Sequence, residues 1–242
     1  MATLLIIKTG SARKRVDPQQ GDFEHWFARG LAGAGLTVTV CDVTAGQQLP
    51  DYLGVAGALV TGSPAMVTER APWSEAARLW LAHAAGEGMP LLGICYGHQL
   101  LADALGGEVG FHPEGREIGS RLLQSLAPAA QDPLFAAMPG EFMANLSHKQ
   151  SVLVLPPGAV HLVTGDFEPH QVFRWGEQCW GCQFHPEFDG NITRSYVDSL
   201  ADDMAAEGLN VAALRAQVQD TPEAAGILSR FATLVADKAK PR

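Results

Sequence analysis

A cysteine stands between two glycines at the point where a buried strand is expected to pass directly into a helix. Residues 93–97 read Gly-Ile-Cys-Tyr-Gly and end an apolar run that begins at Pro90. A nucleophile on such a sharp turn projects from the end of its strand, and small flanking residues prevent clashes. The helix dipole would stabilise a thiolate at Cys95, and the N–H of Tyr96 could donate to an oxyanion. A buried, unreactive cysteine is the alternative interpretation.

A histidine and a carboxylate lie two positions apart at the end of another apolar stretch, 90 residues after the cysteine. His185 and Glu187 belong to the run Gln-Phe-His-Pro-Glu at 183–187. In an extended segment both side chains would point to the same side. The carboxylate would fix the histidine tautomer and stabilise the imidazolium that forms when the ring accepts a thiol proton. An isolated His-Pro-Glu is typical of an exposed turn, but with Cys95 it completes a set of thiol, base and orienting acid.

The order of apolar and helical segments predicts where these residues meet. Apolar runs at 4–7, 36–43, 55–60 and 90–94 alternate with helical patterns at 22–34, 72–85 and 97–105. This alternation predicts a parallel sheet whose ligand site lies at the carboxyl edge of the strands. The Thr-Gly-Ser-Pro turn at 61–64 follows one of these strands and could direct a backbone N–H to the site, although an ordinary loop fits it equally well.

The remainder of the chain shows a different pattern. From about 108 to 188 the spacing predicts shorter strands with turns, at 151–155, 161–164, 171–175 and 180–184, and after that helical spacing returns around 196–206 and 224–236. We expect one α/β domain over 1–242, with its motifs between about 50 and 190 and a helical C-terminal extension over about 191–242.

Composition excludes several classes of function. The net charge of −9 argues against a nucleic-acid or anionic-membrane surface, and no run approaches the roughly 18 apolar residues of a membrane span. The C-x-x-C of Cys179 and Cys182 lies in an expected strand, where residues three apart face opposite sides, so the thiols should diverge. No zinc, phosphate-loop or dinucleotide motif is present. We expect a cytoplasmic protein without a metal or an organic cofactor.

The combination of motifs resembles class I glutamine amidotransferases, in particular the glutaminase domain of GMP synthases and its stand-alone relatives. Residues 93–101, Gly-Ile-Cys-Tyr-Gly-His-Gln-Leu-Leu, match the nucleophile motif, and 183–187 match the second motif. Ala-Leu-Gly-Gly at 104–107, Glu-Ile-Gly at 117–119, and Ser-His at 147–148 followed by Leu-Pro at 155–156 are also similar to the family. The similarity runs from about residue 50 to 190.

The resemblance implies a fold and a set of reacting residues. The fold would be a flavodoxin-like three-layer sandwich with a mostly parallel central sheet, a smaller antiparallel strand region and a helical tail. Cys95 would be the nucleophile, His185 the base and Glu187 the orienting acid. Ser63 and Tyr96 would supply the N–H groups of an oxyanion hole. Many relatives have glycine where Ser63 stands. A serine at this position would narrow the backbone conformations open to that amide.

The resemblance also implies substrate contacts. Gln99 would line the glutamine pocket, and the backbone of Ser147, His148, Lys149 and Gln150 would hold the α-amino and carboxylate groups of the substrate. Lys149 and Gln150 differ from the pattern of GMP synthases.

The activity implied is hydrolysis of the glutamine side-chain amide through a thioester on Cys95. The 55 residues after Glu187 contain no phosphate loop, so a separate synthase or acceptor protein is expected to use the ammonia. One alternative is a γ-glutamyl peptidase, in which the same residues cleave γ-glutamyl peptides. A second alternative is a non-catalytic regulatory relative, against which the presence of all three reacting residues argues.

Overall fold

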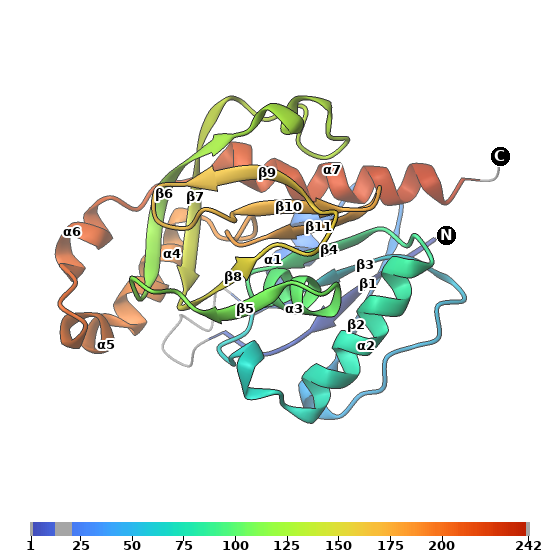
Figure 1. The fold of residues 1–242 in the computed structure, drawn as a ribbon, viewed down its shortest axis with the longest axis horizontal. Helices are drawn as coiled ribbons and strands as arrows, with labels where there is room; N and C mark the ends of the chain where they lie inside the picture. The colour runs from blue at the N-terminus through green and yellow to red at the C-terminus, as the bar shows by residue number, and fades with distance from the viewer. Residues whose placement is uncertain (1, 13–20, 241–242) are drawn as a thin grey trace.

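A large sheet forms the centre of the molecule (Figure 1). The structure is a computed structural model that describes residues 2–12 and 21–240, so both ends of the predicted 1–242 domain lie outside the described residues. Within that part the sheet has nine strands in the order β2-β1-β3-β4-β11-β10-β9-β6-β7. The strands from β2 to β11 pair in parallel, and those from β11 to β7 pair antiparallel.

The parallel strands carry apolar runs that the sequence predicts as strands. They are β1 (Thr3–Lys8), β2 (Thr37–Asp42), β3 (Val55–Val60), β4 (Leu91–Ile94) and β11 (Cys179–Cys182). Side chains of a strand alternate between its two faces. Leu4 and Ile6 of β1 accordingly belong to one core cluster, and Leu5 and Ile7 belong to a second. Both faces of the sheet are therefore buried at β1, β3, β4 and β11, which explains why these four strands read as apolar runs, whereas the edge strand β2 is largely exposed.

Helices cover both faces of these strands. The first cluster includes residues of α1 (Phe23–Gly30) and α7 (Pro222–Lys238), and the second includes residues of α2 (Pro72–Gly86) and α3 (Tyr96–Ala104). The aromatic face predicted for the first helix is buried, because Phe23, Trp26 and Phe27 are at most 2% exposed. Helix, sheet and helix form three layers, which confirms the predicted fold class.

The antiparallel half of the sheet is more extensive than the sequence pattern predicts. Its strands are β10 (Val172–Trp175), β9 (Val160–Gly165), β6 (Glu117–Ser125) and β7 (Glu141–His148), and a separate two-stranded sheet consists of β5 (Glu108–Phe111) and β8 (Gln150–Val154). The strands β6 and β7 pair from Glu117↔His148 to Gln124↔Glu141. Neither is among the predicted strands, because both bury polar residues that interrupt an apolar alternation.

The C-terminal extension packs mainly against the antiparallel half of the sheet, while its last helix also contacts the parallel strand β3. Its helices are α4 (Gly190–Ser199), α5 (Ala201–Ala206), α6 (Val211–Ala216) and α7. Three short 3-10 helices lie elsewhere among the described residues, at Val43–Ala45, Val67–Glu69 and Ala127–Gln131. Ile118 of β6 shares a small core with Leu200 and Met204, all at most 1% exposed. The extension is thereby fixed beside the start of β6.

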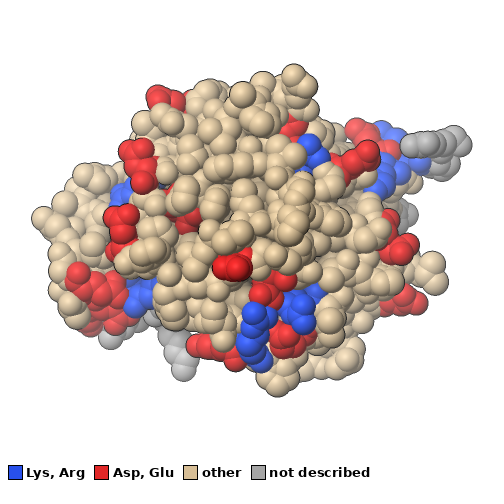
Figure 2. Space-filling view, in the orientation of Figure 1, with Lys and Arg blue, Asp and Glu red and all other residues tan. Residues whose placement is uncertain are grey.

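Charged side chains gather mainly around the rim of the face shown in Figure 2. The half-exposed Leu153 and Val154 of β8 are among the apolar residues on the surface. No helix among the described residues is long and apolar enough to cross a membrane.

Candidate active site

Cys95 occupies a strained turn between β4 and α3. Its backbone has φ 51° and ψ −100°, a conformation that side-chain-bearing residues rarely adopt. A Cβ atom at Gly97 would lie 2.5 Å from the carbonyl oxygen of Val60, and one at Gly93 would overlap the Gly97 backbone. The two glycines are therefore required for strand and helix to approach this closely, as the G-x-C-x-G pattern predicts.

His185 lies beside Cys95 because β11 is the neighbour of β4. The Cys95 N–H donates to the carbonyl of Cys182 (2.8 Å), the last residue of β11, and His185 follows three residues later. The predicted strand at 180–184 ends at Cys182, and 186–187 form a turn rather than an extended segment. This turn still directs the carboxylate to the ring, with 2.7 Å between Nδ1 of His185 and Oε1 of Glu187. Turn geometry, not strand alternation, brings the two side chains together.

A buried asparagine holds this turn, and the sequence pattern gave no signal for it. The Asn145 carbonyl accepts the His185 N–H (2.8 Å), and the Asn145 side-chain amide donates to the Phe188 carbonyl (3.1 Å). The Phe188 ring stacks on the imidazole, with centroids 4.0 Å apart and an interplanar angle of 10°. Asn145 and Phe188 therefore fix the backbone and the ring plane of His185.

The electrostatics favour a charged imidazole. Burial alone would lower the pKa of His185, but the Glu187 carboxylate and the Cys95 sulfur more than offset it and raise the pKa to about 10. Because the Nδ1 proton is shared with Glu187, Nε2 is the nitrogen left for proton transfer. The Cys95 thiol itself is directed at the carbonyl of Ser147, 3.7 Å away.

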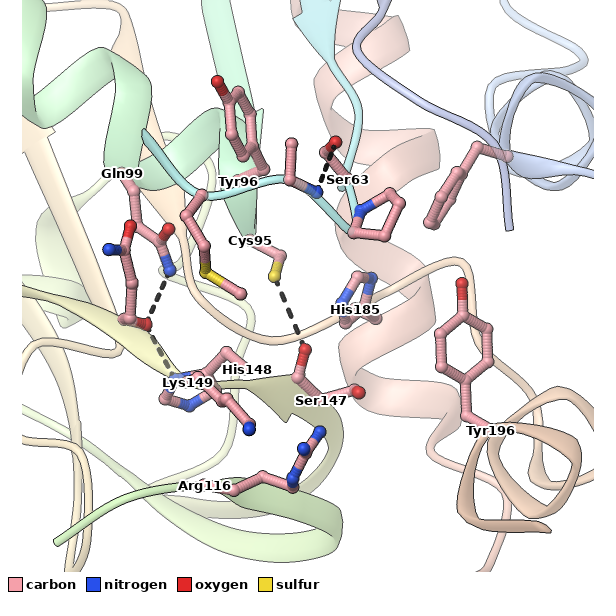
Figure 3. A pocket seen from close by; sticks show the side chains of 15 residues that line it. Ser63, Cys95, Tyr96, Gln99, Arg116, Ser147, His148, Lys149, His185 and Tyr196 are labelled. Carbon is pink, nitrogen blue, oxygen red and sulfur yellow. Dashed lines mark hydrogen bonds between the residues drawn. The ribbon is translucent and has the colours of Figure 1, made fainter. Parts of the chain in front are cut away.

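The structure brings eight of the nine predicted site residues to one pocket, here called the Cys95 pocket (Figure 3). They are Ser63, Cys95, Tyr96, Gln99, Ser147, His148, Lys149 and His185. The ninth, Glu187, bonds to the Nδ1 side of His185 and is 8% exposed. Arg116 also lines the pocket and is not among the predicted residues, although it directly precedes the Glu-Ile-Gly segment of the family resemblance.

The loop that carries Ser63 is tied to the end of β1. The Ser63 hydroxyl donates to the carbonyl of Thr9 (2.7 Å) and accepts the N–H of Ala65 (3.1 Å). At Gly62 a Cβ atom would lie 2.9 Å from Cε1 of His185, so this loop packs directly on the imidazole. The Ser63 hydroxyl thus joins its loop to the residue after β1, a support that glycine would lack.

The side chains of Gln99 and His148 are engaged within the protein. The Gln99 amide nitrogen donates to the Gln150 carbonyl (2.6 Å) and to Oε1 of Gln183 (3.0 Å). The two ring nitrogens of His148 contact the Gln150 carbonyl and Oε2 of Glu117, each at 3.0 Å. Both side chains therefore stabilise the 147–150 segment that lines the pocket.

The two cysteines of the C-x-x-C sequence diverge, as the strand geometry predicts. Cys179 belongs to the core cluster on one face of the sheet, and Cys182 belongs to the cluster on the other. Both thiols are free. Across residues 2–12 and 21–240, no group of three or more His, Cys, Asp or Glu side chains is placed to hold a metal ion.

Comparison with known proteins decides the family. Residues 19–203 match the model of the family described as glutamine amidotransferase class-I. The chain belongs to this family. A glutamine-hydrolysing GMP synthase of Thermosipho africanus is 34% identical over 208 residues, which are 83% of this chain and 36% of that protein. Another, of Porphyromonas gingivalis, is 37% identical over 152 residues, which are 62% of this chain and 28% of that protein.

The amidotransferase chain thus spans about a third of the length of the curated relatives it matches. Solved structures share its fold over nearly the whole length. A glutamine amidotransferase from Methylobacillus flagellatus has a TM-score of 0.75 at 24% identity, covering 98% of this chain and 94% of its own. One from Thermotoga maritima has a TM-score of 0.74 at 18% identity, covering 99% of both chains.

Proposed function

We propose that this amidotransferase hydrolyses the side-chain amide of glutamine and releases ammonia to a separate synthase or acceptor protein. The observation that carries the proposal is that the Cys95 turn and the His185–Glu187 pair meet at one pocket. Support for a synthase partner comes from the relatives, which are glutamine-hydrolysing GMP synthases about three times the length of the matched region.

The reaction would begin with transfer of the Cys95 proton to Nε2 of His185. The thiolate then attacks the side-chain carbonyl carbon of glutamine, and the N–H groups of Tyr96 and Ser63 stabilise the oxyanion. His185 returns the proton to the leaving nitrogen, the C–N bond breaks, and ammonia departs from a γ-glutamyl thioester. Water, deprotonated by His185, then attacks the thioester; its proton returns to the sulfur and glutamate is released.

Glu187 would remain ionised throughout and stabilise the imidazolium. Phe188 and Asn145 would keep the ring in the orientation in which Nε2 meets both the sulfur and the leaving nitrogen. Splitting one difficult amide cleavage into two acyl transfers requires no cofactor.

The proposal is tested by glutamate release from glutamine, γ-glutamyl dipeptides and glutathione conjugates, with and without cell extract. We expect slow glutamine hydrolysis by the protein alone and an increase of about ten- to a thousandfold with a partner. For comparison, loss of one oxyanion donor lowers turnover about a hundred- to a thousandfold. Faster cleavage of a γ-glutamyl peptide than of glutamine, without stimulation by extract, would instead establish a peptidase.

Substitution of the nucleophile provides the second arm of the test. Cys95→Ala should abolish hydrolysis, whereas Cys41→Ala, at another buried thiol on β2, should leave it unchanged. His185→Ala should be nearly as damaging as Cys95→Ala, and Glu187→Gln milder. Retention of more than about a tenth of the activity by Cys95→Ala would exclude the thioester mechanism.

A further inference from the structure

The loop between β3 and α2, at 61–71 and here called the Ser63 loop, forms one wall of the Cys95 pocket. Its residues 63–66 line the pocket, and Figure 3 shows Ser63 and Tyr96 on the same side of Cys95. The oxyanion hole in the proposed mechanism takes one N–H from the loop, at Ser63, and one from the first residue of α3, Tyr96. The two donors can therefore act on one oxygen only if the loop keeps a fixed position relative to α3.

An ion pair outside the pocket joins these two elements. Arg70 lies at the far end of the Ser63 loop, just before α2 begins, and Asp103 lies in the last turn of α3. Nη1 of Arg70 lies 2.6 Å from Oδ2 of Asp103, and Nη2 lies 2.7 Å from Oδ1, so the guanidinium donates to both carboxylate oxygens. Neither residue is among the described residues that line the pocket. The pair thus connects the loop to the helix without touching the site.

This pair belongs to a cluster of charges rather than standing alone. Glu75 accepts a hydrogen bond from Nη1 of Arg70 (3.2 Å) and one from Nε of Arg78 (3.0 Å). Nε of Arg78 also lies 3.6 Å from Asp103, whose side chain is only 10% exposed. Isolated pairs between exposed charges contribute little to stability, but bidentate pairs and networks are the exception. Hydrogen bonds to Asp103 and Glu75 raise the pKa of Arg70, so its charge is permanent.

The backbone of Arg70 makes the pair accessible to a clean substitution. Its φ of 52° and ψ of 39° lie in the left-handed region that favours glycine, and its N–H donates to the carbonyl of Val67 (3.1 Å). Glycine at this position would keep that turn and relieve its strain while removing the guanidinium. Any loss of activity in Arg70→Gly would therefore come from the lost ion pair rather than from a strained turn.

We propose that Arg70 is a positioning residue for the oxyanion hole, and that its ion pair with Asp103 holds the Ser63 loop where the N–H groups of Ser63 and Tyr96 meet the same oxygen. Turnover depends on stabilising the oxyanion and should depend on this pair. Binding of glutamine before reaction and the reactivity of the Cys95 sulfur involve no oxyanion, so both should be independent of the pair. This inference rests on the proposed function.

The test compares a reaction that forms an oxyanion with one that forms none. Hydrolysis of glutamine by the full chain forms one, whereas iodoacetamide alkylates the Cys95 thiolate by displacement of iodide and forms none. Arg70→Gly and Asp103→Asn should each lower kcat for glutamine about ten- to a hundredfold, with KM within about twofold. The rate of alkylation, followed by the mass of the peptide that contains Cys95, should stay within about twofold.

Three further variants separate positioning from a general effect on the fold. Arg78→Gln removes a guanidinium of the same cluster that lies on α2 rather than on the Ser63 loop, and should leave kcat within about twofold. Combining Arg70→Gly with Asp103→Asn should lower kcat no further than either change alone, because both break one contact. Arg70→Lys keeps a charged donor and should recover part of the turnover. Thermal unfolding of each variant verifies the fold.

The possible failures are distinguishable. If kcat and alkylation of Cys95 fall together, the pair supports the nucleophile turn or the whole fold, and the positioning role is wrong. The role is also wrong if Arg70→Gly leaves kcat unchanged, or if Arg78→Gln lowers it as much; in each of these cases the proposed function stands. If neither the unsubstituted protein nor its extract-stimulated form releases glutamate from glutamine, the proposed function is wrong and this inference falls with it.

Discussion

Replacing Cys95 by glycine should give a more stable protein than replacing it by alanine, which reverses the usual order of the two residues. In ordinary helix or strand positions glycine is about 0.5–1 kcal/mol less stable than alanine, because the unfolded chain gains more freedom. At Cys95 the backbone has φ 51° and ψ −100°, a conformation that costs a residue with a Cβ atom about 1–3 kcal/mol and costs glycine little.

The difference between these two terms gives the expected magnitude. Glycine relieves about 2 kcal/mol of backbone strain in the folded state, but it costs about 1 kcal/mol because the unfolded chain becomes more flexible. The free energy of unfolding should therefore be about 1 kcal/mol higher for Cys95→Gly than for Cys95→Ala. For a chain of this size, about 1 kcal/mol corresponds to about 2–4 °C in the midpoint of thermal unfolding. Both variants lack the thiol, so neither should hydrolyse glutamine.

Urea unfolding of Cys95→Gly and Cys95→Ala measures the difference directly. The control is Ala102→Gly, within α3 and fully buried, where glycine should lower the free energy of unfolding by about 1 kcal/mol or more. If Cys95→Gly were less stable than Cys95→Ala by as much as Ala102→Gly is less stable than the original protein, the turn would hold no strain and this reasoning would be wrong.

Two further predictions concern His185. Gly62→Ala places a Cβ atom 2.9 Å from the imidazole and should lower turnover with glutamine at least about tenfold. Gly86→Ala, where nothing lies within 4 Å of the added atom, should leave turnover unchanged. Equal turnover in the two variants would contradict the packing argument. The pKa of His185 is raised from 6.5 to about 10, so its contribution to stability is complete below about pH 6.5 and is lost as pH rises to about 10. Urea unfolding across this range should show a steeper decline for the original protein than for Glu187→Gln; parallel declines would show that Glu187 does not raise this pKa.

Much of the parallel half of the fold is predictable because strands buried on both faces appear in the sequence as short, continuous apolar runs. The predicted run at 55–60 coincides with β3, and the run at 90–94 contains β4. The glycines around Cys95 also mark their turn, since only glycine permits the contact with Val60. Parallel strands joined by right-handed crossovers then place Cys95, which follows β4, at the carboxyl edge of the sheet.

The residues that hold the site in place give no comparable signal in the sequence. Asn145 lies in the middle of β7 and is fully buried, but its structural role depends on a hydrogen bond with the backbone N–H of His185, 40 residues later. Arg116 and Glu207 are 91 residues apart and pair only because α5 packs beside β6. Local periodicity contains no information on contacts between distant segments, so these positions required the three-dimensional structure.

The adjacency of β4 and β11 also has a consequence for biosynthesis. In register, Ile94 pairs with Cys182, but the chain between them forms the antiparallel strands and must be completed first. During translation the Cys95 thiol emerges from the ribosome about 90 residues before its histidine. Pairing between strands of such long sequence separation is slow, because the entropy cost of closing the intervening loop precedes the gain from the contact. A nascent or truncated chain would therefore present an ordinary cysteine, and the proposed amide hydrolysis would require that the last strand of the parallel half is inserted between β4 and β10.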